Sequence, residues 1–319
     1  MKVAILNLNP GIDRVIYLDA PTRTGQMNRA ARTLLTSGSK AANQARIFSL
    51  LGDEVDFYTF TGGPFGDVCN ALTAAPHVTL HSVPTAAGVR TNTKIIDRDG
   101  LCTEFNESGG PVTLGELARL KTALLDGCGK VDVLSICGSL PQGVEKDFYK
   151  QIILAAREQN PHIFVALDCS GEALCQGFSV HPDLIKPNRG ELAELLALHS
   201  LFEDLYTAEQ ICTACGKLGG ERTEILCTMD ADGSLAVGPE GNYRVSTPTV
   251  PFRSFSGAGD TYLAAYLHAK FAEEKSFPEA LRFASAAAAA RVAHDGTELP
   301  TVADIVALLE QTTVTQINS

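Results

Sequence analysis

Residues 255–260 read Phe-Ser-Gly-Ala-Gly-Asp and lead directly into the apolar stretch 262–267. This pattern predicts a helix that begins at the glycines and carries Asp260 in its first turn. The N-terminus of a helix attracts anions, because its first four N–H groups lack partners and the helix dipole adds about half a positive charge. Asp260 is therefore either a carboxylate that caps a helix or a base held beside a bound phosphate. These six residues leave both interpretations open.

The overall composition is typical of a globular enzyme. Of the 319 residues, 45% are hydrophobic and 20% are charged, and the net charge is −11. This charge argues against nucleic acid or an anionic membrane surface as the main partner, although a small anionic substrate can bind where basic residues gather. We find neither a stretch typical of a membrane-spanning helix nor a signal peptide, so we expect a cytoplasmic protein.

The cysteines indicate reduced thiols. There are nine of them, an odd number without a secretory signal, which does not suit a disulfide framework. Cys212 and Cys215 form a C-x-x-C motif in a helical stretch, but no second pair matches them. We therefore interpret both as small buried side chains and not as metal ligands.

Strand-like stretches alternate with helical ones through most of the chain. This alternation favours an α/β fold with a mostly parallel sheet covered by helices on both faces. The predicted core strands are residues 2–8, 55–60, 131–137, 163–167, 184–185 and 224–228. Capping-box spacing predicts helix starts at Thr113/Glu116, Thr207/Gln210 and Ser276/Glu279.

Two segments interrupt this alternation. Residues 13–18 with 28–35, and residues 89–97 with 101–106, have the pattern of β-ribbons without intervening helices. We predict that they form a small discontinuous sheet, from about residues 12–36 and 88–108, that projects from the core as a lid. The alternative is that they are edge strands of the main sheet. Because no Pro/Ser-rich linker or internal repeat occurs, we expect residues 1–319 to form a single domain.

Several short motifs follow one another in a specific order and spacing. They are Asn9-Pro10-Gly11-Ile12-Asp13, Asn28-Arg29, residues 37–46 (SGSKAANQAR), Arg90-Thr91-Asn92, Gly138-Ser139-Leu140-Pro141, residues 168–174 (DCSGEAL), Lys186-Pro187-Asn188-Arg189-Gly190-Glu191 and residues 255–260. Their order and spacing resemble those of the PfkB/ribokinase family of sugar kinases. The similarity runs from residue 5 to about residue 300 and is greatest with the branch of 1-phosphofructokinases and tagatose-6-phosphate kinases. The resemblance implies a ribokinase-like three-layer α/β/α fold with a small β-sheet lid.

The resemblance implies a catalytic role for Asp260. In the family, the aspartate of this G-A-G-D motif accepts a proton from the sugar hydroxyl. Gly257, Ala258 and Gly259 are then expected to supply backbone N–H donors to the transferred phosphoryl group.

The nucleotide and metal sites are expected around Asn188-x-x-Glu191. This spacing by itself indicates a capped helix start. Family members use the same N-x-x-E motif to hold the Mg²⁺–phosphate assembly, and Glu191 could serve in both ways. Lys186 is expected near the nucleotide phosphates. The nucleotide loop is expected at Thr228, Asp230 and Gly233, where relatives commonly show S-L-G-x-x-G and where Asp230 replaces a glycine.

The sugar site is expected around a second glycine-containing motif. Gly38, Ser39, Lys40 and Asn43 match the family's G-G-K-G-x-N, in which the backbone approaches the sugar. Here Ser39 and Ala41 replace glycines, and we expect them to tighten the pocket or to change which sugar fits. In the family an acid at the position of Asp13 binds sugar hydroxyls, whereas Asn-Pro-Gly before it also suits a simple turn.

A cationic cluster indicates a substrate that already carries a phosphate. Each arginine taken singly is more simply explained as a member of a surface ion pair. Together with the motifs of the 1-phosphofructokinase and tagatose-6-phosphate kinase branch, these arginines favour a sugar phosphate over a free sugar or a nucleoside as the substrate. The candidate phosphate-binding residues are Arg29, Lys40, Arg90 and Ser139.

The resemblance thus implies an ATP- and Mg²⁺-dependent kinase acting on a ketohexose monophosphate. The expected reaction converts D-fructose 1-phosphate to fructose 1,6-bisphosphate. The alternatives are a tagatose-6-phosphate or fructose-6-phosphate kinase, a free-sugar or nucleoside kinase, and a non-catalytic sugar-phosphate-binding regulator. A homodimer is expected because family lids often meet across a two-fold axis.

Overall fold

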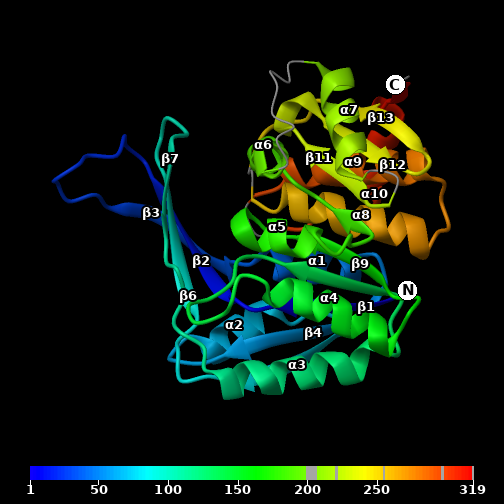
Figure 1. The fold of residues 1–319 in the computed structure, drawn as a ribbon. Helices are drawn as coiled ribbons and strands as arrows, with labels where there is room; N and C mark the ends of the chain where they lie inside the picture. The colour runs from blue at the N-terminus through cyan, green and yellow to red at the C-terminus, as the bar shows by residue number, and fades with distance from the viewer. Residues whose placement is uncertain (199–206, 220–221, 254–255, 296–297, 318–319) are drawn as a thin grey trace.

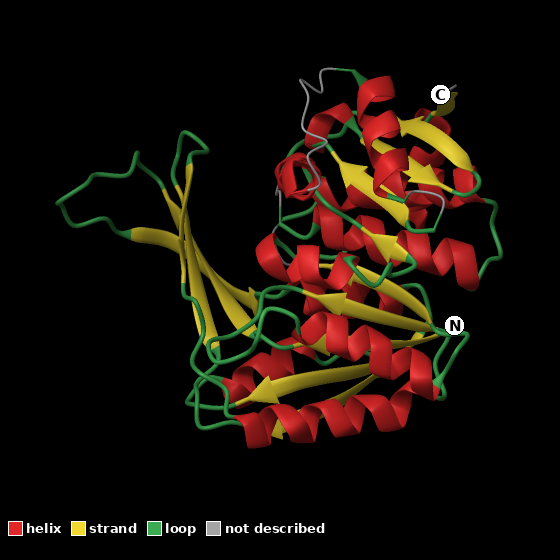
Figure 2. Cartoon of the chain, viewed as in Figure 1, coloured by secondary structure: helices red, strands yellow, loops and turns green. Residues whose placement is uncertain are grey.

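The computed structural model describes residues 1–319 except 199–206, 220–221, 254–255, 296–297 and 318–319. Phe255, the first residue of the motif 255–260, therefore lies outside the described residues. The described strands form two separate sheets, one in the body of the molecule and one that projects from its side (Figures 1 and 2).

The central sheet has ten strands in the order β14-β13-β12-β11-β10-β9-β8-β1-β4-β5. Neighbouring strands from β5 to β11 are parallel, whereas β12, β13 and β14 are antiparallel additions at one side. The bounds are β1 (Lys2–Asn7), β4 (Glu54–Thr61), β5 (Val78–Pro84), β8 (Val133–Cys137), β9 (Phe164–Asp168), β10 (Leu184–Ile185), β11 (Glu224–Thr228), β12 (Ser234–Gly238), β13 (Gly241–Val245) and β14 (Val314–Ile317).

The predicted core strands all occur, with ends shifted by at most a few residues. The predicted core strands did not include β5, β12, β13 and β14. Of these, β5, β13 and β14 lie at or next to the edges of the sheet and are only partly buried, so their hydrophobic pattern is weak.

Helices cover both faces of the central sheet, which confirms the predicted three-layer α/β/α fold. On one face the core includes side chains of α3 (Leu114–Cys128), α4 (Phe148–Gln159), α5 (Gly171–Phe178), α6 (Arg189–Leu198) and α7 (Ala208–Leu218). On the other it includes side chains of α1 (Lys40–Leu50), α8 (Ala258–Phe271), α9 (Phe277–Val292) and α10 (Val302–Leu308). The three predicted capping boxes form at the starts of α3, α7 and α9. None of the helices described is long and apolar enough to cross a membrane.

The second sheet has the order β3-β2-β6-β7. Its strands are β2 (Gly11–Leu18), β3 (Ala30–Ser37), β6 (Arg90–Ile96) and β7 (Cys102–Asn106), and the central pair β2–β6 is parallel. The two predicted ribbons thus form a sheet of their own and not edge strands of the central sheet. Near its base, α2 (Gly66–Thr73) contributes Cys69 to a small cluster with Ile12 and Val89.

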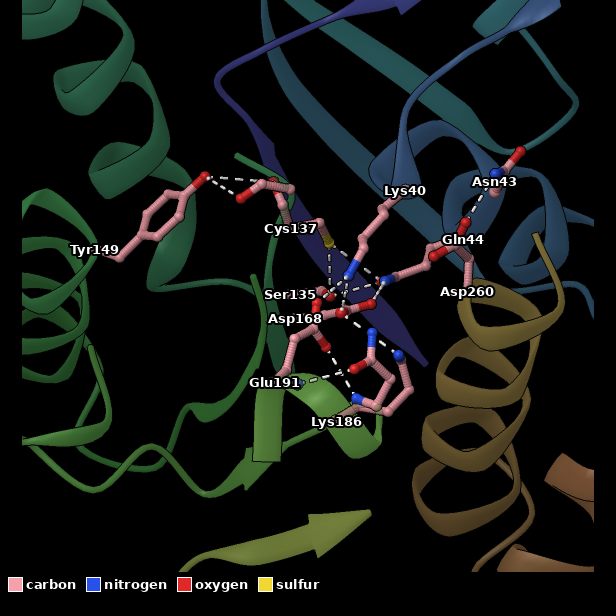
Figure 3. A network of polar contacts seen from close by, with 12 residues as sticks. Lys40, Asn43, Gln44, Ser135, Cys137, Tyr149, Asp168, Lys186, Glu191 and Asp260 are labelled. Atoms are coloured by element: carbon pink, nitrogen blue, oxygen red, sulfur yellow. Dashed lines mark hydrogen bonds and ion pairs between the residues drawn. The ribbon is translucent and has the colours of Figure 1, made fainter. Parts of the chain in front are cut away.

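The carboxyl ends of the parallel strands bring polar residues to one edge of the body. Asp168 is the last residue of β9, and Lys186 directly follows β10. The starts of α1, at Lys40, and of α8 face the same region (Figure 3). In open α/β sheets, ligands bind at this edge.

Candidate active site

The start of α8 holds Asp260 in a nearly closed environment. Gly257 has φ = 81° and begins the turn into the helix, a backbone conformation that favours glycine. A Cβ atom at Gly257 would also lie 3.3 Å from Nδ2 of Asn43, so the position has little space for a side chain. Asn43 Nδ2 donates a hydrogen bond of 2.8 Å to Oδ2 of Asp260, and Asp260 is only 8% exposed.

A buried ionic cluster lies beside Asp260 (Figure 3). Its centre is Asp168, which is fully buried and accepts hydrogen bonds from Lys40 Nζ at 2.7 Å and from Gln44 Nε2 at 3.4 Å. Lys186 Nζ lies 3.4 Å from the same oxygen as Lys40. Two ammonium groups thus share one carboxylate oxygen.

The cluster shifts the pKa values of its members. Burial by itself raises the pKa of Asp168, but Lys186 and Lys40 outweigh it, and the pKa lies below its ordinary value. Burial also raises the pKa of Asp260, the Asp168 carboxylate raises it further, and the Lys40 charge opposes both, with a net upward shift. For Lys40, burial is outweighed by Asp168 and Glu191, which raise its pKa and keep it charged. Asp260 is therefore the more basic of the two carboxylates.

The N-x-x-E motif forms a helix cap whose acid also faces this cluster. Glu191 N donates to Oδ1 of Asn188, and Asn188 N donates to Oε2 of Glu191, both at 2.9 Å. The other carboxylate oxygen of Glu191 lies 3.8 Å from Lys40 Nζ. The orientation of Glu191 is thus compatible with both predicted roles, a helix cap and an acid that holds the Mg²⁺–phosphate assembly.

Lys186 lies directly against the first turn of α8. A Cβ atom at Gly259 would lie 3.3 Å from its Nζ, so a larger residue at Gly259 would crowd the ammonium group. Ala258 is the first residue of the same turn. A cation thus lies beside the N-terminus of α8, the end of a helix that attracts anions.

The predicted nucleotide loop is next to Asn188. Thr228 pairs with Asn188 in an isolated bridge, at the end of β11. Asp230 has φ = 53° and Gly233 has φ = 88°, both in the left-handed region. A Cβ atom at Gly233 would lie 2.0 Å from the backbone oxygen of Val245, so only glycine fits there. A positive φ favours glycine, the residue that relatives commonly have at the position of Asp230. Aspartate is among the other residues that tolerate this conformation.

A cleft of about 730 Å³ lies between the second sheet and the starts of α1 and α8. Asp13 stands in its wall, where Asn92 Nδ2 donates to Oδ1 at 2.8 Å and Lys94 Nζ contacts Oδ2 at 2.9 Å. The backbone at Gly38 is so close that a Cβ atom would lie 2.1 Å from Asp13 Oδ1. The predicted residues that line the cleft are Asp13, Gly38, Ser39, Lys40, Asn43, Arg90, Gly257 and Asp260.

The two glycine replacements in the 38–43 motif have local explanations. Ser39 caps α1: its hydroxyl accepts a hydrogen bond of 3.1 Å from Ala42 N and another of 3.2 Å from Asn7 Nδ2. Its φ of −122° needs no glycine. Ala41 is buried in the hydrophobic core and does not line the cleft.

The predicted phosphate-binding residues are only partly brought together. Arg90 and Lys40 line the cleft. Arg29 is exposed, just before β3, and does not line it. Ser139 is also exposed and outside the lining, although Asn9 Nδ2 donates to its hydroxyl at 3.0 Å. Within one chain, therefore, the predicted four-residue cluster does not form around this cleft.

Three residues in the site received no predicted role. Asp168 could have been found as a polar residue that ends an apolar strand at the edge where ligands bind. Asn92 and Lys94 could have been found from the period of two on β6, which places them on the same face as Arg90.

The C-x-x-C cysteines are both buried in α7, as predicted. Burial raises the pKa of Cys212 to about 11, which disfavours a thiolate ligand.

Comparison with known proteins agrees with this geometry. The model of the pfkB family carbohydrate kinases matches residues 6–304. The chain is 30% identical over 314 residues to a 1-phosphofructokinase of Escherichia coli, with 97% of each chain covered. It is 29% identical over 264 residues to a tagatose-6-phosphate kinase of Staphylococcus epidermidis, covering 82% of this chain and 83% of the relative. Phosphofructokinase-2 of Escherichia coli, solved in complex with substrates and products, superposes with a TM-score of 0.87 at 26% identity, covering 98% of this chain and 99% of the other. With a family match over nearly its whole length, this chain belongs to the pfkB family of carbohydrate kinases.

Proposed function

We propose that this protein transfers the terminal phosphoryl group of ATP to O6 of D-fructose 1-phosphate and forms fructose 1,6-bisphosphate. The observation that carries the proposal is that Asp260, Asp13 and Arg90 line a single cleft. A buried acid, a carboxylate that can bind hydroxyls and a cation for a phosphate therefore face one space. The relatives named as sugar-phosphate kinases support the same substrate class.

In this reaction Asp260 would accept the proton of the attacking hydroxyl. Asn43 holds Oδ2, which fixes the orientation of the carboxylate. Its raised pKa makes it a stronger proton acceptor than an ordinary aspartate. The backbone N–H groups of 257–259 would stabilise the charge on the transferred group, and transfer would be direct and in line.

ATP and magnesium would occupy the side of α8 where Lys186, Asn188 and Thr228 lie. No group of three or more His, Cys, Asp or Glu side chains in the described ranges could hold a metal by itself. Magnesium needs no such group, because it keeps several waters and takes one or two carboxylates together with phosphate oxygens. Glu191, whose carboxylate the cap holds toward the cluster, fits that requirement. Bound Mg²⁺ neutralises charge on the nucleotide phosphates.

The second sheet would act as a lid over the sugar. Its contacts with the body include Lys94 to Ser256 at 3.4 Å and Arg32 to Asp295 at 3.4 Å. Closure on the sugar phosphate would exclude water and limit hydrolysis of ATP.

A kinetic panel tests the proposed substrate. ADP release with ATP and Mg²⁺ is measured for D-fructose 1-phosphate, D-tagatose 6-phosphate, D-fructose 6-phosphate and free D-fructose. We expect the highest kcat/KM for D-fructose 1-phosphate and no useful rate with free fructose. A higher value for either 6-phosphate would reject the proposed substrate, and no ADP release with any sugar would reject a kinase role.

The second candidate function is a tagatose-6-phosphate kinase. The relative of that name supports it. The same panel separates the two functions, because D-fructose 1-phosphate and D-tagatose 6-phosphate differ in the position of the phosphate and in the configuration at C4.

We propose a homodimer that associates through the outer face of the second sheet. Asp13 and Glu104 line the cleft, so their strand neighbours Arg14 and Phe105 point to the opposite face. Leu35 pairs with Arg14 and shares that face; it is 50% exposed, and Phe105 is 61% exposed. Light scattering should give twice the mass of 33.9 kDa, and a monomer would contradict the proposal.

A further inference from the structure

We propose that Arg291 is a positioning residue of the proposed reaction, whose buried guanidinium adds positive potential to the N-terminus of α8, where the phosphoryl group is transferred. This inference rests on the proposed function and adds to it a residue that the substrates do not touch. Arg291 lies in the last turn of α9, is only 4% exposed and does not line the cleft.

The guanidinium of Arg291 lies against the glycine turn that begins α8. A Cβ atom at Gly257 would lie 3.6 Å from Nε of Arg291 and 3.3 Å from Nδ2 of Asn43, the residue that holds Asp260. Because glycine has no side chain, the guanidinium can lie this close to the turn. Gly257 also lines the cleft. A single glycine is thus next to both the cleft and a buried cation.

The charge of Arg291 interacts with Asp260. Burial and the nearby charge of Arg46 on α1 lower the pKa of Arg291, whereas the Asp260 carboxylate raises it. An arginine stays protonated at neutral pH despite such a shift, because its ordinary pKa is so high. Burying one cation near another is unfavourable, and groups perturbed in this way gather at functional sites. The interaction is mutual, so Arg291 favours the ionised form of Asp260.

Charged side chains from several elements lie near Asp260. Burial and Asp168, at the end of β9, oppose its ionisation, whereas Lys40 of α1 and Lys186 after β10 favour it. Both lysines contact the same oxygen of Asp168. Arg291 brings a further cation from α9, on a different helix from either lysine. Since charges interact more strongly in the interior than in water, this cation supports both the ionised base and negative charge at the start of α8.

The test compares variants that remove or keep the charge of Arg291. Arg291→Met keeps much of the side-chain length without the charge. With ATP and the best phosphorylated ketohexose of the panel, we expect kcat to fall by about tenfold or more. This is less than the loss of about 10²–10³-fold that follows removal of a donor in direct contact with the reacting group. KM for the sugar phosphate should change little, because Arg291 does not line the cleft.

The pH profile gives a second measurement on the same variants. Activity requires ionised Asp260, and loss of a nearby cation raises the pKa of a carboxylate. The acidic limb of kcat/KM should therefore move to higher pH in Arg291→Met. Arg291→Lys keeps the charge, so it should restore most of kcat and return the limb to its wild-type position.

Arg157→Met is the matched control. Arg157 also lies in the last turn of a helix, α4, and donates to the backbone oxygens of Val180 and His181 away from the cleft lining. Arg291 likewise donates to the backbone oxygen of His294, at 3.5 Å. Arg157→Met thus removes a comparable arginine, and its kcat and acidic limb should equal those of wild type.

The outcomes separate the possible roles. If Arg291 only stabilises the end of α9, Arg291→Met will lower the free energy of unfolding but leave kcat and the acidic limb unchanged, and that result would overturn the proposal. If Arg291→Met does not fold, Arg291→Lys decides: preserved kcat and pH limb support the proposal, whereas a fall in kcat of tenfold or more with the charge retained would overturn it. An inactive wild type with all phosphorylated ketohexoses would instead refute the proposed function on which the inference depends.

Discussion

Asn43 on α1 donates a 2.8 Å hydrogen bond to Asp260 at the start of α8, and this contact joins two segments that lie 217 residues apart. It fixes one carboxylate oxygen of Asp260 beside the fully buried Asp168 and its two lysines. The proposed base is therefore held by the same helix, α1, that supplies Lys40 to the ionic cluster and Gly38 and Ser39 to the cleft just before it.

Asp260→Asn should lower kcat by about 10²–10⁴-fold, because the amide cannot accept the hydroxyl proton. ATP binding, measured by calorimetry, should be kept, since the backbone donors of α8 remain in place. Unchanged turnover would exclude Asp260 as the base.

The pH profile should report the interaction between Asp260 and Asp168. Activity requires ionised Asp260, so kcat/KM is lost as the pH falls through its pKa, which burial and Asp168 raise above the ordinary value of about 3.9. Asp168→Asn removes a negative charge and should move this acidic limb to lower pH. The variant also leaves two lysines without their shared carboxylate and should lose about 3–5 kcal/mol of unfolding free energy. If the acidic limb of the kcat/KM profile does not move in Asp168→Asn, the charge of Asp168 does not raise the pKa of Asp260.

Arg90→Ala should raise KM for the sugar phosphate by about tenfold or more while KM for ATP changes little. Arg98→Ala provides the control, because Arg98 is an exposed arginine in the turn of the same sheet that pairs only with its neighbour Asp99 among the described contacts. Equal effects of Arg90→Ala on both substrates would argue against a phosphate-binding role.

Cys102 offers a test of lid closure. It is an exposed thiol on β7 that lines the cleft, whereas most other cysteines are buried. Partial burial of the thiol and the nearby Glu104 raise the pKa of Cys102, so alkylation should be followed at about pH 9. The sugar phosphate should slow labelling of Cys102 several-fold, and Cys102→Ser identifies the reacting site. Identical rates with and without substrate would contradict closure over this residue.

Ser39 is expected to affect stability more than sugar choice. Ser39→Ala removes the cap of α1 and should cost about 1 kcal/mol of unfolding free energy, whereas Ser39→Gly should cost only a few tenths. Urea denaturation measures both values. A changed ratio of kcat/KM between D-fructose 1-phosphate and D-tagatose 6-phosphate in Ser39→Gly would instead show that the hydroxyl reaches the sugar.

The sequence by itself determined the layers of this protein and the neighbourhood of its site. Apolar strands such as Val133–Cys137 and the capping boxes of α3, α7 and α9 are local patterns, because periodicity and capping depend on residues a few positions apart. The motifs that carry the family resemblance are local as well, and they include the N-x-x-E cap and the turn before Asp260.

Only the tertiary structure decided which of these residues meet. It joined Asp168 to Lys40 and Lys186, left Arg29 outside the cleft, and showed that Ser39 serves as a helix cap. Charge pairing, burial and hydrogen-bond satisfaction are relations between segments far apart in the chain, and no local pattern encodes those distances.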